Sequence, residues 1–453
     1  MIDLRKGQEV ELACVRLEAG GAGLAPYGDY EVLVLGTLPG QRLRARIEHI
    51  SPHRANGRTR AWGRVLETLL PSPHEVPPSC PAFGTCGGCV WQHLALAEQR
   101  AWKHTLVAEA FAARGLPTNL LAACEASPAA VAYRNQAKYV VQASSRGVVL
   151  GGYAPRSHDV VDLTACTLVE PPLAKTVNQI AASITSQPSL HAELRHVVLR
   201  ASGVGQVLVT LVFRTRARAE SAAARGLAAA LRMAQPEIAG VVANVNGTDG
   251  DVIFGAEEFT LEGEAFVADE IAGARVHLSS RAFFQVNRHV AAAAYLAIAA
   301  FARKVGDVRR VWDVYAGVGT IARVLAAQLP CLEDAFCVEI RSSAVEDARR
   351  SEHTGRARLT FLAADAGDGL RARVGQPDLV VLNPPRAGCA PEVMEAVTAA
   401  EPRGIAYLSC LPETLARDLA WLSQQGYRIT RATPFDMLPH TPHVETLVCL
   451  ERV

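Results

Sequence analysis

Three cysteines crowd into the ten-residue stretch CPAFGTCGGC of this 453-residue chain. They are Cys80, Cys86 and Cys89. With His93 just beyond them, their spacing suits a closed Cys3His zinc site as well as an iron–sulfur cluster. A CxxC redox pair usually follows a strand of a βαβ unit, whereas the proline-rich segment 71–81 precedes this one. The stretch therefore predicts a metal site and leaves the metal open.

A separate cysteine has the position of a nucleophile. Cys410 ends the apolar stretch GIAYLSC, just before a predicted helix that begins at Pro412. A thiol at the positive end of a helix dipole ionises more readily, and the thiolate is the reactive form. Downstream, PHTPHVE offers His440, His443 and Glu445, and a carboxylate in an apolar strand is costly unless it is paired or used. A packing thiol and ordinary loop histidines are the competing interpretations.

A glycine-rich turn and two strand-end carboxylates indicate a nucleoside site. YAGVGT follows an apolar strand and contains Gly317 and Gly319, while Glu339 and Asp365 end the next two predicted strands. Carboxylates at these positions can reach ribose hydroxyls and an adenine amine. The chain has no Walker lysine at this turn and no complete GxGxxG. The pattern favours S-adenosylmethionine over a dinucleotide or ATP.

The elements that must position these residues form a doubly wound α/β sheet. From about residue 308, apolar strands alternate with predicted helices at 321–328, 342–352, 391–400 and 412–425. The stretches YRITRATP and VETLVCLE are predicted to add two final strands. Ligands of such sheets lie beyond the carboxyl ends of the strands, which is where the candidate residues fall.

Two further domains are predicted upstream. Short apolar runs and glycine turns over residues 1–68 indicate a small β-barrel. Within 41–64 there are seven arginines and one acid, and the alternation in RLRARI places the charges on one face of a strand. This basic rim favours RNA binding over a plain solvated face. Residues 131–270 are β-rich with one helical segment at 216–234, which indicates an α+β middle domain.

The bulk properties are those of a globular protein, with 49% hydrophobic and 20% charged residues. The start MIDLRKGQEVEL has no apolar core, and the longest apolar run, 290–302, is too short for a bilayer. We therefore expect a cytoplasmic protein with reduced thiols and no membrane partner. A net charge of +1 says nothing about nucleic acid, and a monomer is the simplest assumption.

Taken together, the motifs resemble those of the RNA uracil-5-methyltransferases, specifically the branch with a TRAM barrel and an iron–sulfur cluster that modifies 23S rRNA. GQEVELACVRLEAGGAGLAPYG to ARAWGRVLE resembles TRAM, and CPAFGTCGGCVWQH with DLTAC resembles the cluster motif. RAFFQVN, DVYAGVGT, LNPPRAG, SCLPETLARDL and PHTPHVET resemble the methyltransferase signatures, in family order. The resemblance implies an OB-like TRAM barrel (1–68), a central 4Fe-4S and RNA-binding domain (72–92 and 124–275) and a Rossmann-like class I methyltransferase domain (93–123 and 276–453).

The resemblance also implies a role for each candidate residue. Cys410 would add to carbon 6 of uracil and so make carbon 5 nucleophilic, and Glu445 would remove the carbon 5 proton after methyl transfer. Cys166 would be the fourth cluster ligand, beside Cys80, Cys86 and Cys89. The implied S-adenosylmethionine contacts are Gln285, Tyr315, Gly317, Gly319, Thr320, Glu339, Asp365 and Asn383. The target uridine must be single-stranded or flipped out.

Three positions differ from the family pattern. Asn383 and Leu411 stand where aspartate and asparagine are usual, and Ala316 stands where cysteine is common. The leading hypothesis is an S-adenosylmethionine-dependent 23S rRNA uridine C5-methyltransferase with a 4Fe-4S cluster. The alternatives are a methyltransferase for the T-loop uridine of tRNA and a non-catalytic RNA-binding or ribosome assembly factor, the latter motivated by Leu411 and Asn383.

Overall fold

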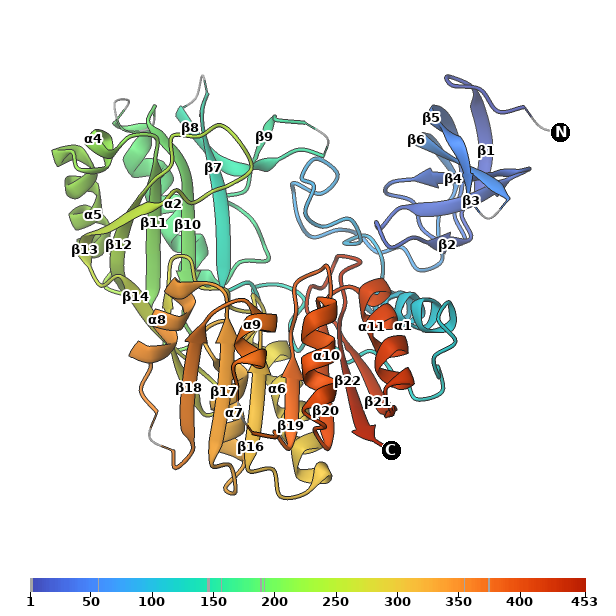
Figure 1. Cartoon of the computed structure of the whole chain (residues 1–453). Helices are drawn as coiled ribbons and strands as arrows, with labels where there is room; N and C mark the ends of the chain where they lie inside the picture. The colour runs from blue at the N-terminus through green and yellow to red at the C-terminus, as the bar shows by residue number, and fades with distance from the viewer. Residues whose placement is uncertain are drawn as a thin grey trace.

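The computed structural model describes residues 3–55, 57–144, 147–155, 157–187, 190, 192–353, 355–373 and 375–453. Figure 1 shows three lobes: an N-terminal sheet, a middle sheet with helices, and a C-terminal sheet with helices on both faces. The middle and C-terminal lobes lie against each other, while the N-terminal sheet stands beside them. In the described part of the chain, no helix is long and apolar enough to cross a membrane.

The N-terminal lobe is a six-stranded sheet in the order β1-β5-β6-β4-β3-β2. Its strands are β1 (Glu9–Ala13), β2 (Arg16–Leu17), β3 (Gly23–Tyr27), β4 (Tyr30–Val34), β5 (Arg42–Ala55) and β6 (Arg58–Leu70). Apolar residues on one face, such as Leu12, Val32 and Leu43, form a separate core. Arg42, Arg44 and Arg46 are exposed while the residues between them are buried, which confirms the predicted alternation.

The arginines at the start of β5 do not form the free basic rim that their sequence predicts. Each faces a glutamate on a neighbouring strand: Arg42–Glu11 at 3.8 Å, Arg44–Glu67 at 2.9 Å and Arg46–Glu9 at 2.6 Å. The segment 41–64 contains few acids, but strand pairing brings acids from outside it to the same face. The positive charge of this strand is therefore largely balanced.

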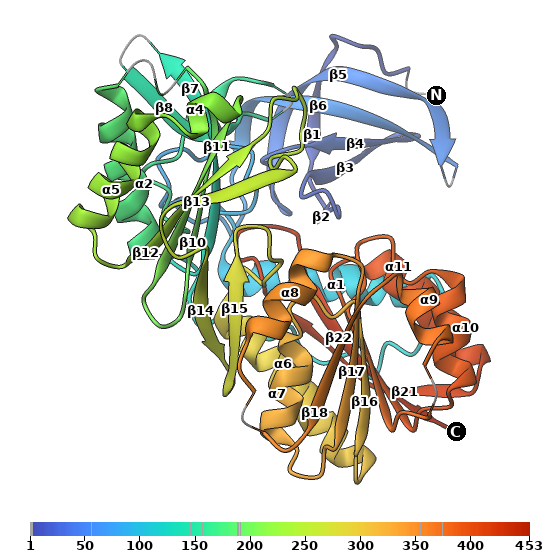
Figure 2. The same cartoon turned by 60° about the vertical axis from the view of Figure 1, so that its left-hand side comes forward.

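The middle lobe is a seven-stranded sheet in the order β13-β12-β11-β10-β7-β8-β9. Its strands are β7 (Gln136–Ser144), β8 (Gly147–Tyr153), β9 (Val160–Asp162), β10 (Leu194–Ala201), β11 (Val207–Phe213), β12 (Ile238–Val245) and β13 (Glu257–Gly263). Helices α2 (Pro171–Thr185) and α5 (Ala222–Ala234) pack on one face, and the short α4 (Arg216–Ala219) precedes α5 (Figure 2). The helical segment at 216–234 was predictable from the sequence, whereas α2 was not predicted.

The C-terminal lobe confirms the doubly wound sheet, in the order β18-β17-β16-β19-β20-β22-β21. Its strands are β16 (Arg310–Val314), β17 (Asp334–Glu339), β18 (Arg358–Ala363), β19 (Leu379–Leu382), β20 (Gly404–Ser409), β21 (Tyr427–Phe435) and β22 (Glu445–Arg452). All neighbours run parallel except β22, which pairs antiparallel with both β20 and β21. The first residues of β22 and the end of β20 therefore lie at one rim.

Two groups of helices cover the two faces of this sheet. One face packs against α6 (Arg288–Val305), α7 (Thr320–Gln328) and α8 (Ser342–Arg350). The other packs against α9 (Ala366–Arg371), α10 (Pro391–Ala399), α11 (Pro412–Gln424) and α1 (Leu96–Ala112). The hairpin of β14 (Phe266–Ile271) and β15 (Ala274–Ser279) contributes apolar residues to the first of these cores.

Candidate active site

Strand pairing places the candidate nucleophile and base next to each other. Ser409, the last residue of β20, pairs with Thr446 of β22, so the next pair in register is Cys410 and Glu445. On its other side Glu445 pairs with Phe435, the end of β21. The carboxylate also influences the ionisation of the Cys410 thiol, as expected at short range. Cys410 and Glu445, which are more than thirty positions apart in the sequence, thus meet at one rim of the sheet.

Glu445 is buried, with 5% of its surface exposed. Burial raises the pKa of its carboxyl to about 8, because the charged form loses its hydration. The side chain is therefore mainly protonated at neutral pH. A carboxylate with a pKa this high is a stronger base than an ordinary glutamate.

The Cys410 thiol differs from its prediction in one respect. Its position before α11 predicts a depressed pKa, but burial raises the pKa, and the nearby Glu445 raises it further. The Arg386 side chain opposes this with its charge and a hydrogen bond to the thiol. Leu411, the residue before α11, provides no side-chain cap for the helix. The resting group is a thiol whose cationic partner is Arg386.

The glycine turn after β16 has the conformation of a ligand cradle. Tyr315, Gly317 and Gly319 all adopt left-handed backbone angles, with φ of 64°, 57° and 75°. A Cβ on Gly319 would lie 2.4 Å from the Phe361 ring, so only glycine fits there, whereas the space beside Gly317 is open. The left-handed Tyr315 is a strained position of the kind that clusters at functional sites.

Both strand-end carboxylates also bond to backbone. Glu339 accepts hydrogen bonds from Gly317 N–H at 3.0 Å and from Arg341 N–H at 2.9 Å, so it braces the glycine turn. Asp365 caps α9 by accepting from Gly367 N–H at 2.9 Å through Oδ1. Each of these oxygens accepts a backbone bond and keeps further lone pairs for a ligand.

A pocket beside this turn collects most of the predicted methyl-donor residues. It is lined by Gln285, Tyr315, Gly317, Thr320 and Asn383, among others. Phe283 and Tyr295 also line it and were not singled out from the sequence. Phe283 is 60% exposed, which is unusual for an aromatic ring and could have been suspected from the doubled phenylalanine in RAFFQVN.

Sequence reasoning also missed Asp313, at the centre of the rim. It is fully buried in β16, and burial raises its pKa to about 7. Its Oδ2 accepts from Ala322 N–H at 3.0 Å, while Oδ1 is buried with no hydrogen-bond partner among the described residues. Asp313 and Glu445 both influence Tyr295, so the three lie around one buried region. An acid inside VRRVWDVYAG was a detectable signal, because buried acids are rare.

The four predicted metal-site cysteines come together from two distant segments. Burial raises the pKa of Cys89 to about 12, and the neighbouring thiols of Cys166, Cys86 and Cys80 raise it further. Backbone N–H groups point at the sulfurs: Gly88 N–H donates to Cys86 Sγ at 3.4 Å. The Cys166 thiol hydrogen-bonds to backbone groups of Leu168 and Val169.

His93, the alternative fourth ligand, has other contacts. Its Nε2 lies 3.1 Å from the carbonyl oxygen of Gly36, and its ring packs against Phe83 with centroids 5.0 Å apart. Over the described ranges, no three His, Cys, Asp or Glu side chains converge as ligands of a single metal ion.

Comparison with known proteins places the chain in a family. The family described as tRNA (Uracil-5-)-methyltransferase matches residues 370–453, and the methyltransferase small domain matches residues 280–400. An uncharacterized RNA methyltransferase of Geobacter sulfurreducens is 34% identical over 99% of this chain and 91% of its own length. Another, from Thermosynechococcus vestitus, is 35% identical over 98% of both chains.

A solved structure shows the same fold. The Pyrococcus abyssi tRNA (uracil-54, C5)-methyltransferase, crystallised with S-adenosyl-L-homocysteine, superposes with a TM-score of 0.73. The superposition covers 97% of this chain and 100% of that one at 23% identity. The C-terminal sheet is therefore a Rossmann-like class I methyltransferase fold. By sequence, the chain belongs to the RNA methyltransferases and is an S-adenosylmethionine-dependent enzyme with a C-terminal domain of the tRNA (uracil-5-)-methyltransferase family.

Proposed function

We propose that the protein methylates carbon 5 of a uridine in 23S rRNA through a covalent adduct between Cys410 and the base. The observation that carries this proposal is the placement of a thiol and a buried carboxylate on adjoining strand ends, beside a glycine-lined pocket. S-adenosylmethionine supplies the methyl group as an electrophilic sulfonium. Family membership supports an enzyme over the non-catalytic alternative.

The two side chains divide the chemistry between them. Cys410 gives its proton to solvent, the charge and hydrogen bond of Arg386 stabilise the thiolate, and Sγ forms a bond to carbon 6 of the uracil. The resulting enolate lets carbon 5 take the methyl group, and S-adenosylhomocysteine leaves. Glu445, ionised at this stage, takes the proton from carbon 5, and the electron pair released expels the Cys410 thiolate. The base becomes 5-methyluracil and the enzyme is regenerated.

Residues of the pocket fit the methyl donor. The open space at Gly317 leaves room for a close approach by the ligand, and the free lone pairs of Glu339 and Asp365 suit ribose hydroxyls and an adenine amine. Gln285, Tyr315, Gly319, Thr320 and Asn383 complete the proposed contacts. Asn383 keeps an acceptor oxygen at its position without the charge of an aspartate.

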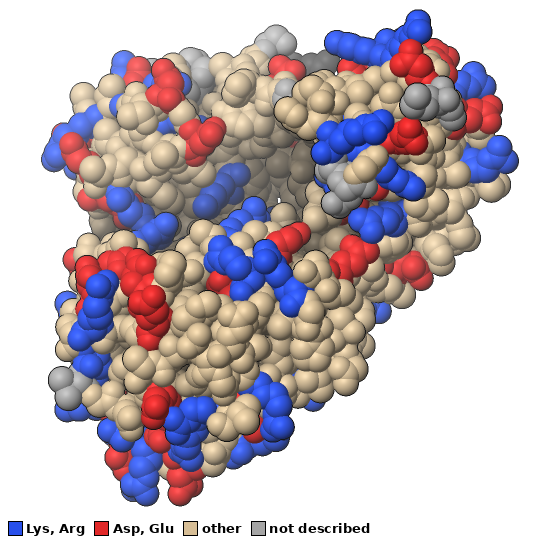
Figure 3. All heavy atoms as spheres, turned by 45° about the vertical axis from the view of Figure 1, so that its right-hand side comes forward, with Lys and Arg blue, Asp and Glu red and all other residues tan. Residues whose placement is uncertain are grey.

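A cluster of unpaired cations supports RNA as the substrate. Burial and the charges of Arg200, Arg134 and Arg341 lower the pKa of Lys138, so these groups lie near one another. In the part of the chain that the structure describes, Arg134, Lys138, Arg341 and Arg386 have no acidic ion-pair partner within 4.0 Å. Figure 3 shows Lys and Arg side chains around the hollow between the lobes. We infer that this hollow holds the phosphates flanking the target uridine.

A 4Fe-4S cluster on Cys80, Cys86, Cys89 and Cys166 fits the cysteine site. The thiols of Cys80, Cys86 and Cys166 all raise the pKa of Cys89, so the four lie near one another, and four cysteine thiolates are the usual ligands of such a cluster. N–H groups directed at the sulfurs are also typical of such sites. When bound, the cluster supplies a rigid link between two segments far apart in the sequence.

The three lobes correspond to three proposed domains. We assign the N-terminal sheet to a TRAM barrel that binds RNA, the middle lobe with the cysteine segment to a central domain, and the rest to the methyltransferase domain. α1 belongs with the last, because Val107 and Phe111 are buried in its core. The β14–β15 hairpin, next to the proposed boundary at residue 275, also contributes apolar residues to one core of that domain.

A tRNA uridine is the second candidate substrate. The family that matches residues 370–453 is described as tRNA (Uracil-5-)-methyltransferase. The Pyrococcus abyssi structure, which shares the fold over 97% of this chain, is a tRNA (uracil-54, C5)-methyltransferase. Neither likeness excludes rRNA, because fold is shared more widely than substrate.

Methyl transfer to defined RNAs tests the proposal. The purified protein is incubated with labelled S-adenosylmethionine and unmodified 23S rRNA or unmodified tRNA, and the labelled nucleotide is mapped. We expect label as 5-methyluridine in 23S rRNA and none in tRNA. Label in tRNA alone would replace the substrate with the second candidate, and label in neither RNA would contradict the proposed function.

A further inference from the structure

The segment that leads into Glu445 needs support from outside its own hairpin. Strands β21 and β22 are joined by residues 436–444, which is longer than the short loops that set their own geometry. His440 in this segment adopts a left-handed backbone with φ of 70°. A non-glycine residue in that region persists when its surroundings hold it there. The position of Glu445 therefore depends on the contacts that hold this segment in place.

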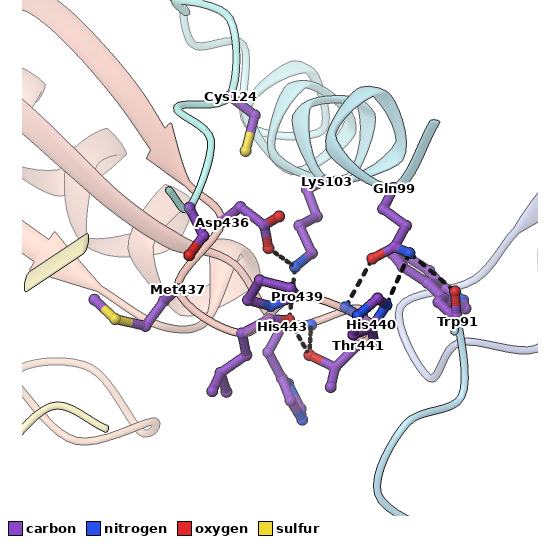
Figure 4. A network of polar contacts seen from close by, with 12 residues as sticks. Trp91, Gln99, Lys103, Cys124, Asp436, Met437, Pro439, His440, Thr441 and His443 are labelled. Atoms are coloured by element: carbon purple, nitrogen blue, oxygen red, sulfur yellow. Dashed lines mark hydrogen bonds and ion pairs between the residues drawn. The ribbon is translucent and has the colours of Figure 1, made fainter. Parts of the chain in front are cut away.

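Helix α1 provides the grip through two buried side chains (Figure 4). Lys103 Nζ pairs with Asp436 Oδ1 at 2.5 Å and donates to the carbonyl oxygen of Leu438 at 2.9 Å. Gln99 Oε1 accepts from His440 N–H at 2.7 Å, and its Nε2 lies 3.3 Å from His440 Nδ1. The first half of the segment, from Asp436 to His440, is thus tied to consecutive turns of one helix.

The Lys103–Asp436 pair has the features of a positioning device. The side chains are 0% and 2% exposed, and burial lowers the pKa of Lys103 against the opposing effect of Asp436. The cost of desolvating the two charges offsets most of their Coulombic attraction, so buried ion pairs of this kind add little to folding stability. Their best-attested role is to select one register or conformation of the chain. Asp436 directly follows Phe435, the residue paired with Glu445. The pair therefore fixes the end of β21, the strand end that is paired with the proposed base.

We infer that Lys103 and Gln99 are positioning residues for Glu445, holding residues 436–444 in the conformation that brings this carboxylate to Cys410. The inference rests on the proposed function and extends it to residues outside the pocket. Cys410 lies between β20 and α11, outside the segment 436–444. Loosening the grip thus leaves adduct formation intact and slows the later removal of the carbon 5 proton.

A charge-free double variant tests this without leaving a buried charge. In Lys103→Met with Asp436→Leu, apolar groups fill the space of the ion pair, so the fold is retained. We expect amide hydrogen exchange over residues 436–446 to rise by about tenfold, with exchange in β16 and β17 unchanged. We also expect unchanged affinity for S-adenosylhomocysteine and accumulation of the covalent protein–RNA adduct on a denaturing gel.

Gln99→Leu is the second variant, should the double variant fold poorly. Its matched control is Gln235→Leu, which removes another buried glutamine, bonded to Thr176 in the middle lobe. The control is expected to exchange and turn over like the wild type. Unchanged exchange over 436–446 in Gln99→Leu, or faster exchange throughout the C-terminal sheet, would overturn the inference, as would resolution of the adduct at the wild-type rate.

The two arms separate this inference from the proposed function. Failure of the proposed function appears as wild-type protein that methylates neither RNA. The exchange measurement needs no RNA, so it decides whether α1 holds the segment in either case.

Discussion

Glu445 and Cys410 lie at the same rim, and burial favours the neutral form of both. The carboxyl has a pKa of about 8, and burial also raises the pKa of the thiol, with Arg386 as the opposing group. A resting site of neutral groups avoids the cost of two negative charges in close contact. The proposed reaction needs each charge at a different time: the thiolate first and the carboxylate after methyl transfer.

The first prediction concerns the stability of Glu445→Gln. Below the unfolded pKa of 4.5 the carboxyl is protonated in both states, so it carries no ionisation penalty. Between pH 4.5 and about 8 the unfolded state ionises while the folded state does not, so wild-type stability falls as pH rises. Glutamine does not titrate. We expect the melting temperature of the variant to exceed that of the wild type by an amount that grows from pH 5 to 8. A constant difference would contradict the raised pKa.

The second prediction concerns Arg386→Gln. Loss of the cation and its hydrogen bond raises the pKa of Cys410, so less thiolate is present at pH 8. We expect alkylation of Cys410 by iodoacetamide, followed by mass spectrometry of its peptide, to slow by about three- to tenfold. The exposed Arg417→Gln, on the following helix, serves as the control and keeps the wild-type rate. Equal rates in all three proteins would exclude Arg386 as the activating group.

Part of the site could be predicted from the sequence at the residue scale. Cys410, Glu445 and the glycine turn stand at strand ends, and strand ends of one sheet meet at one rim. Arg386 and Asp313 were not predicted because each acts on groups from other segments of the chain. Arg386 lies beside the Cys410 thiol, and Asp313 lies in a buried region with Tyr295 and Glu445. The position before α11 predicts a thiol that ionises readily, whereas burial and the nearby Glu445 raise its pKa.

Among the elements, β5 and the hollow between lobes differ in how their charges are compensated. The β5 arginines are exposed but paired with glutamates of β1 and β6, whereas Lys138 of β7 and Arg341 after β17 have no such partners among the described residues. A phosphate competes with a carboxylate at the first site and not at the second. The hollow should therefore contribute more to RNA binding than the arginine-rich strand.

The third prediction compares two variants that remove the same charge. Lys138→Gln with Arg341→Gln should lower the slope of log K against log salt for RNA binding by about 0.7 for each lost phosphate contact. Arg42→Gln with Arg44→Gln should change the slope much less, because Glu11 and Glu67 already balance these arginines. Equal losses in both variants would assign RNA binding to the N-terminal sheet as well as to the hollow.

The strands and helices were predictable where the pattern was local. The alternating residues of β5 and the C-terminal strand–helix repeat were read from periodicity. The ion pairing of β5 was not, because it depends on which strands become neighbours. Helix α2 was missed although Leu173, Val177, Ile180 and Ile184 follow helical spacing after Pro171 and Pro172, a local signal that the surrounding β-rich stretches obscured.

At the scale of the whole molecule, hydrogen bonds join the cysteine segment to the segment 436–444 that precedes Glu445. Trp91, two residues beyond Cys89, donates its backbone N–H to the carbonyl oxygen of His440 at 2.9 Å, and Gln99 bonds to the backbone of both. Tyr133 adds a hydrogen bond from its hydroxyl to Pro439 O at 3.2 Å. A site that is remote from Cys410 in sequence therefore borders the segment that carries Glu445.

The fourth prediction concerns the metal content of the intact protein. Purified without air, it should contain about four iron and four sulfide per chain, as a 4Fe-4S cluster requires. Cys166→Ser should lose this content, whereas Cys331→Ser, which changes a cysteine outside the site, should retain it. Zinc without iron would contradict the cluster assignment.

Release of the carbon 5 hydrogen tests the central claim most directly. RNA carrying tritium on carbon 5 of uridine is incubated with S-adenosylmethionine, and tritium released to water is compared with methyl groups transferred. With the wild type we predict equal amounts of tritium released and methyl groups transferred, and with Cys410→Ala we predict neither. With Glu445→Gln we predict methyl transfer without tritium release, because the adduct stalls before the carbon 5 proton is removed. Wild-type methyl transfer without tritium release, or full release by Cys410→Ala, would contradict covalent catalysis by Cys410.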